Sequence, residues 1–118
     1  MQTIYFKYEQ NPDTDGKTQV AHRATIIEYR YGGTQNGQHL YYRKHVTVID
    51  LTDDGFRRMT QNSTNIGLKP VNPEDHPDFK LLTGDDAHKV CVLLNDMYRE
   101  SLKYDAMIPY MQHLSERI

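Results

Sequence analysis

Apolar and polar residues alternate along most of the first half of the chain. Residues 2–9 place apolar side chains at every second position, and residues 18–31 are rich in β-branched and aromatic residues. A period of two is typical of a half-buried strand. We therefore expect a strand over each range. The second strand should carry a bulge near Ile26 and Ile27, where apolar residues occupy both parities.

A glycine-rich turn separates the second of these stretches from a third. Residues 32–37 contain three glycines and the pair Asn36-Gly37, and residues 39–51 return to alternation. Asn-Gly between two β-type runs is a strong hairpin signal, because both residues tolerate positive φ. The first half is therefore predicted to form an antiparallel meander of about three strands.

The pattern changes after residue 51. Thr52 can cap a helix, and Asp53 and Asp54 suit the positive end of its dipole. Phe56 and Met59 would then face the core. We predict a short helix that begins at Thr52 and ends near residues 61–63.

Residues 64–82 are the least regular part of the sequence. Three prolines fix bends in this range and remove backbone donors. The apolar residues between 66 and 71 could form a fourth, short edge strand. Phe79, Leu81 and Leu82 are expected to hold the following loop against the core.

Helical spacing dominates the last third. Thr83 with Asp86 resembles a capping box, and apolar residues then recur at intervals of three and four. We predict a long C-terminal helix packed on one face of the sheet, broken at Pro109 and followed by an amphipathic tail over 110–118. The sequence thus predicts a single α+β domain over residues 1–118.

Composition narrows the functional classes. Fourteen basic and sixteen acidic residues give a net charge of −2, without the basic excess of a general nucleic-acid binder. The single cysteine, Cys91, allows neither an internal disulfide nor a cysteine-based zinc site. No apolar run reaches the length of a membrane span, and the first residues do not resemble a secretory signal. We expect a cytoplasmic protein with no membrane association.

Two patterns in the sequence resemble metal sites in part. Asn11, Asp13, Asp15 and Gly16 match the opening of a calcium-binding EF-hand loop, but the closing position holds His22 instead of glutamate. The six histidines do not show the close spacing of zinc ligands. We therefore predict no metal and no cofactor, and interpret these residues as surface turns and surface histidines.

Candidate catalytic residues are equally isolated. Cys91 lies on the apolar face of the predicted main helix, where a buried thiol is inert. Paired aspartates at 53–54 and 85–86 are explained by helix-start electrostatics. No phosphate-binding glycine loop or serine elbow is present. The sequence therefore predicts a protein that is not an enzyme, with a site assembled from distant residues as the remaining enzyme or metal alternative.

The hairpin is the one region whose composition indicates a binding surface. Tyrosine and arginine are enriched at protein interfaces, and the same residues could stack on unpaired bases. Cross-strand aromatic packing is the structural alternative. The candidate partner-binding residues are Tyr29, Arg30, Tyr31, Tyr41, Arg43 and Lys44.

These observations lead to one main functional hypothesis. We expect a non-enzymatic protein-interaction module, such as a small adaptor or inhibitor that binds a larger protein through a Tyr/Arg-rich sheet surface. A nucleic-acid-binding domain using the same hairpin is the alternative. A homodimer is also compatible with the sequence, because an open meander has edge strands to protect.

Overall fold

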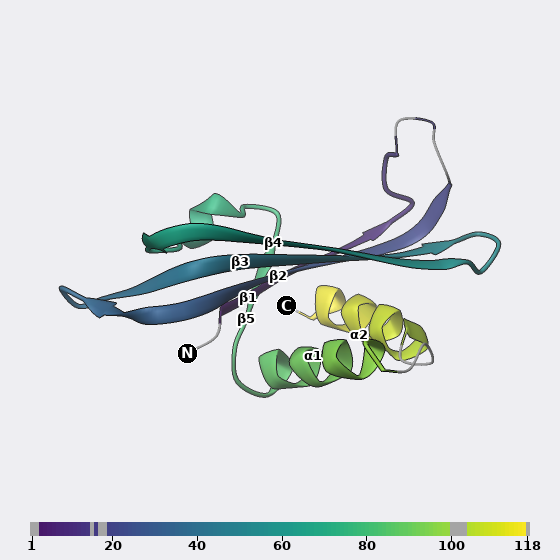
Figure 1. The fold of residues 1–118 in the computed structure, drawn as a ribbon. Coiled ribbons are helices and arrows are strands. Elements are labelled where there is room, and N and C mark those ends of the chain that lie inside the picture. The colour runs from purple at the N-terminus through teal and green to yellow at the C-terminus, as the bar shows by residue number, and fades with distance from the viewer. Residues whose placement is uncertain (1–2, 15, 17–18, 100–103, 118) are drawn as a thin grey trace.

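The computed structural model describes residues 3–14, 16, 19–99 and 104–117. They form an α+β fold in which two helices cover one face of a five-stranded sheet (Figure 1). The prediction of an α+β fold is confirmed, but the sheet has more strands than the three or four expected.

Every neighbouring pair of strands in the sheet is antiparallel. The strands are β1 (Thr3–Gln10), β2 (Val20–Gln35), β3 (Gln38–Thr52), β4 (Arg57–Lys69) and β5 (Lys80–Leu82), arranged in the order β4-β3-β2-β1-β5. The first four strands form a meander. The chain then crosses the sheet from β4 to add β5 at the opposite edge, beside β1.

The predicted hairpin is present between β2 and β3. Asn36 and Gly37 both have positive φ, 52° and 78°, which matches the twist that a two-residue hairpin turn needs. Breaks in register follow Arg30 and Tyr31 close to this turn. The prediction of a bulge at Ile26 and Ile27 is wrong, because the register between β2 and β3 is regular there. Apolar residues occupy both parities at this point because both faces of the sheet are covered.

The helix predicted from Thr52 is wrong, because this part of the chain continues the sheet. Thr52 lies in a tight turn, where its Oγ1 accepts a hydrogen bond from the Phe56 amide at 3.0 Å and Gly55 has a φ of 82°. Strand β4 follows at once. Its many Thr, Asn and Ser residues are poor helix formers, and pairing with β3 satisfies backbone groups that would otherwise be left at the edge. Phe56 is exposed, whereas Met59 packs on the core as expected.

The short edge strand predicted between 66 and 71 is the end of this long strand. Ile66 and Leu68 belong to β4, and Val71 lies in the segment that crosses the sheet. Leu82 is buried and Phe79 packs on a second apolar cluster, but Leu81 is exposed.

Two helices replace the single long one predicted. Helix α1 (Gly84–Met97) begins after Thr83 as expected, although the Thr83 side chain makes no capping bond. Helix α2 is Tyr104–Glu116, with Pro109 inside it, so the break falls before residue 104 and not at the proline. Among the described residues, neither helix is long and apolar enough to cross a membrane.

The main core lies between the helices and the sheet. Alternate residues of β1, β2 and β3 meet the apolar faces of both helices, because side chains on one strand parity share a face. Its largest fully buried members are Ile4, Phe6, Ile26, Ile49, Val90, Met107 and Met111.

A second apolar cluster, called the outer cluster below, lies on the face of the sheet opposite the helices, called the outer face. The segment of residues 70–79, called the crossing segment below, carries a single turn of 3-10 helix (Pro73–Asp75) over this face. Val71 and Phe79 of this segment pack on the cluster. Its buried members are Tyr5, Ile27, Tyr29 and Tyr41.

Candidate functional site

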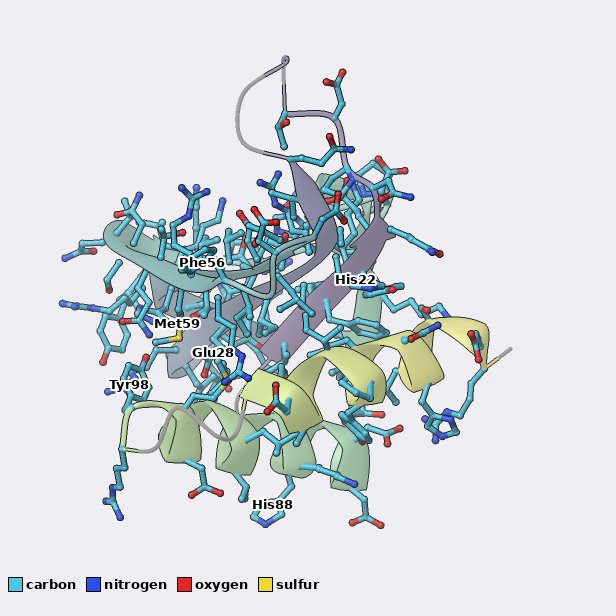
Figure 2. All side chains as sticks on the ribbon, turned by 90° about the vertical axis from the view of Figure 1, so that its right-hand side faces the viewer. His22, Glu28, Phe56, Met59, His88 and Tyr98 are labelled. Carbon is cyan, nitrogen blue, oxygen red and sulfur yellow. The ribbon has the colours of Figure 1, made fainter. Side chains whose placement is uncertain are left out.

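The helices leave a cleft on their side of the sheet, with a volume of about 700 Å³. Strands β2, β3 and β4 form one wall and helix α1 forms the other. Figure 2 shows Glu28 of β2 and Tyr98 at the end of α1 on this side of the sheet. The lining residues are Glu28, Arg30, Tyr42, Arg43, His45, Ser63, Cys91, Leu94, Asn95 and Tyr98.

Strand register explains why polar residues gather in this cleft. On β2, the parity that faces the helices carries the buried residues Ala24 and Ile26, and then continues as Glu28 and Arg30. The facing positions of β3 are also polar here, since His45 lies opposite Glu28. The two strands therefore extend the core face into a charged surface.

Two arginines stand directly opposite each other at this cleft. Arg30 of β2 is the register partner of Arg43 of β3, and both side chains are exposed. Like charges at directly opposed positions destabilise a strand pair. The Arg43 Nη1 donates a hydrogen bond to Ser63 Oγ at 3.3 Å, which directs its guanidinium toward β4. The pair concentrates positive charge in a chain with a net charge of −2.

Tyr98 links helix α1 to the sheet at the β4 side of the cleft. Its hydroxyl accepts a hydrogen bond from Gln61 Nε2 and lies 3.4 Å from His45 Nε2. The sequence pattern places Tyr98 on the apolar helix face, but its side chain is largely exposed. It therefore presents an aromatic ring at the cleft and does not contribute to the core.

The chemistry of Cys91 suits a packing role. Burial, and secondarily the negative charge of Glu28, raise the pKa of the Cys91 thiol above its usual value. A thiol held in its protonated form is a weaker nucleophile and a weaker metal ligand than a thiolate. The cleft therefore offers charge and hydrogen-bonding groups, without an activated nucleophile at this cysteine.

The structure divides the six predicted partner-binding residues between two faces. Arg30 and Arg43 line the cleft, whereas Tyr29, Tyr31, Tyr41 and Lys44 lie on the opposite face. Whether any of the six contacts a partner stays a prediction.

Burial distinguishes the tyrosines of this second group. Tyr29 and Tyr41 are only 5% and 6% exposed. The Tyr29 hydroxyl lies 2.6 Å from His76 Nε2, and Tyr41 accepts a hydrogen bond from Thr3 Oγ1 at 2.8 Å. These two rings therefore stabilise the outer cluster, as the packing alternative expected.

Sequence reasoning missed the other residues of the cleft. Glu28, His45, Ser63 and Asn95 come from separate elements, and only the strand register and the path of α1 bring them together. The available signal was the charge on the apolar parity of β2, where Glu28 follows Ile26.

The predicted absence of a metal site remains a prediction. Within the described ranges, no three His, Cys, Asp or Glu side chains are close enough to hold an ion. Asp15 of the calcium-like loop lies outside the described residues, whereas Asn11 and Asp13 of that loop are exposed.

The chain was compared with models of protein families, with curated proteins and with solved structures. None of the three comparisons gave a significant match.

Proposed function

We propose that this chain is a non-enzymatic protein-interaction module that binds an acidic segment of a larger protein in the cleft between α1 and strands β2–β4. The observation that carries the proposal is the directly opposed pair Arg30 and Arg43. An adaptor or an inhibitor would use such a cleft in the same way.

The arginine pair is electrostatically unfavourable in the free protein. Two cations in directly opposed positions cost stability in the free protein, and the Arg30 side chain makes no hydrogen bond or ion pair with another described residue. A carboxylate placed between two guanidinium groups accepts charge-assisted hydrogen bonds from both. Binding of an acidic side chain would therefore remove a repulsion and add an attraction.

The neighbouring aromatic residues suit a protein ligand. Tyr42 and Tyr98 line the same cleft, and Tyr98 is 53% exposed. Tyrosine and arginine dominate the energetics of protein interfaces, because each combines a large contact area with directional hydrogen bonding. The cleft thus combines anchoring charge with apolar contact area.

The test uses fluorescence anisotropy with a labelled peptide of alternating glutamate and glycine as a minimal acidic ligand. The double substitution Arg30→Glu, Arg43→Glu should weaken binding roughly tenfold or more, through loss of the charge-assisted contacts. The double substitution Lys7→Glu, Lys89→Glu changes the net charge by the same amount outside the cleft and should leave the affinity close to that of the wild type.

A second ligand separates protein binding from the nucleic-acid alternative. A labelled single-stranded oligothymidine should bind more weakly than the peptide at every salt concentration. Tighter oligonucleotide binding that falls steeply with salt would favour nucleic acid instead. Failure of the wild-type protein to bind the acidic peptide at low salt, or equal losses in both double variants, would contradict the proposal.

A further inference from the structure

We infer that the free edge of β4 pairs with β4 of a second copy of this chain, which joins two sheets into one about a two-fold axis. The inference does not depend on the proposed function of the cleft. It follows from the hydrogen-bonding direction, the composition and the symmetry of this edge.

The direction of the backbone groups can be derived from the turn before β4. The Thr52 amide donates to the carbonyl of Phe56 at 2.9 Å, so the backbone groups of Phe56 point toward β3. Along an antiparallel strand this direction alternates from residue to residue. The residues whose N–H and C=O groups point to the open edge are Arg57, Met59, Gln61, Ser63 and Asn65.

The regular part of this edge is nine residues long. Register with β3 is continuous from Arg57 to Asn65 and then breaks, where Gly67 has a φ of 69°. This break in register is a β-bulge, which twists the edge strand and prevents a partner strand from pairing beyond it. The stretch available to a partner is therefore residues 57–65.

After Arg58, this stretch lacks the features that usually protect an edge. Natural proteins place lysine, proline or inward-pointing charge on exposed edge strands, or keep these strands very short. Residues 59–65 contain no charge and no proline, and most of them are exposed. The opposite edge of the sheet differs, because β5 has three residues only.

Symmetry favours a second copy as the occupant. Centring the two-fold axis on Gln61 pairs residue 57 with 65, 59 with 63, and 61 with its own copy, so all outward-pointing groups meet outward-pointing groups. No two like charges are opposite each other in this register.

The cations at the start of the strand are already balanced within one copy. Arg57 Nη2 lies 2.9 Å from Asp105 Oδ1, and Arg58 Nη2 lies 3.0 Å from Asp50 Oδ2. The approach of a second copy therefore does not bring uncompensated charge together at this end.

The test measures molar mass by sedimentation equilibrium over a protein concentration series. Wild-type protein should shift from monomer to dimer as the concentration rises. The double substitution Thr60→Lys, Asn62→Lys should remain a monomer, because residue 60 lies opposite residue 62 of the other copy and lysines then face lysines. Both side chains are exposed, so the fold should persist.

A matched variant and a backbone variant make the result specific. Gln10→Lys with Gln35→Lys adds the same charge at exposed positions on β1 and β2 and should dimerise like the wild type. Gln61→Pro removes an outward N–H, which only the dimer uses, and should also give a monomer.

Three outcomes would overturn the inference. They are a wild-type protein that stays monomeric throughout, a dimer that persists in the folded lysine variant, and open-ended oligomers in place of a dimer. Far-ultraviolet circular dichroism of each variant identifies any loss of fold.

Discussion

Asp50 is a buried carboxylate on the outer face of the sheet, where it pairs with two arginines. Its carboxylate is almost fully buried on β3, accepting from Arg23 Nε at 2.7 Å and from Arg58 Nη2 at 3.0 Å. Burial alone would raise the pKa of Asp50, but the hydrogen bonds and charges of the two arginines outweigh it and lower the pKa below its usual value. The ion pairs therefore tie β2 and β4 to the strand between them.

Removing the charge of Asp50 should destabilise the fold, because Arg23 and Arg58 lose their ion-pair partner. We expect Asp50→Asn to lower the free energy of unfolding by roughly 2–3 kcal/mol, near the lower limit for a broken buried pair, because Arg58 can turn into water. Urea denaturation at neutral pH measures this difference. Because the folded-state pKa is depressed, the contribution is present above the unfolded-state pKa and is lost as pH falls through the folded-state pKa. A difference that grows on acidification would contradict this assignment.

Thr47 is a buried polar residue on the face of the sheet that the helices cover, and its hydroxyl lacks a partner among the described residues. Its side chain is fully buried between the sheet and the helices. A buried hydroxyl without a partner costs stability, and valine has nearly the same shape. We expect Thr47→Val to raise the free energy of unfolding by about 1 kcal/mol, measured by urea denaturation. Thr60→Val, at an exposed position, controls for strand propensity; an equal gain there would show that burial is not the cause.

The crossing segment is held to the sheet in part by His76. His76 lies against Tyr5 and Tyr29, with ring centroids 5.0 and 5.8 Å apart. Burial and then the positive charge of Lys44 lower its pKa, and Asp75 opposes them only in part. The histidine is therefore held neutral within the outer cluster.

This environment gives the fold a defined pH dependence. A lowered folded-state pKa means that the unfolded chain takes up the proton first, so stability should fall as pH drops below about 6.5. His76→Gln should flatten this part of the profile, measured by thermal unfolding between pH 5 and 8, the range in which histidine titrates. His88→Gln, on α1, is the matched control. An unchanged profile in the His76 variant would assign the effect to other groups.

The hairpin and β4 illustrate what the sequence can predict. Asn36-Gly37 specifies its turn locally, because few residues other than glycine and asparagine adopt positive φ. The turn at residues 52–56 carries the same residue types as a helix start, and only the presence of β3 as a partner selects the strand. The cleft has the same limit: no local pattern reveals that Arg30 stands opposite Arg43.

At the scale of the whole molecule, the sheet extends beyond its helical cover. The radius of gyration is 14.9 Å and the long axis is 50 Å against 29 Å for the others. A compact chain of this length would have a radius of gyration of about 13.5 Å. The hairpin end of β2 and β3 reaches beyond both helices, which contributes to this elongation (Figure 1). The elongated shape therefore follows from the length of the β2–β3 hairpin.

The path of the crossing segment also affects the order in which the strands pair during folding. Strands β2, β3 and β4 pair with their neighbours in sequence, whereas β5 joins β1 only after the chain has crossed the whole sheet. Contacts between distant residues form late, because loop closure costs entropy first. In denaturant-jump kinetics, Leu82→Ala on β5 should therefore mainly accelerate unfolding, whereas Ile49→Val on β3 should slow folding. The reverse assignment would mean that the β5 edge of the sheet is established before its centre.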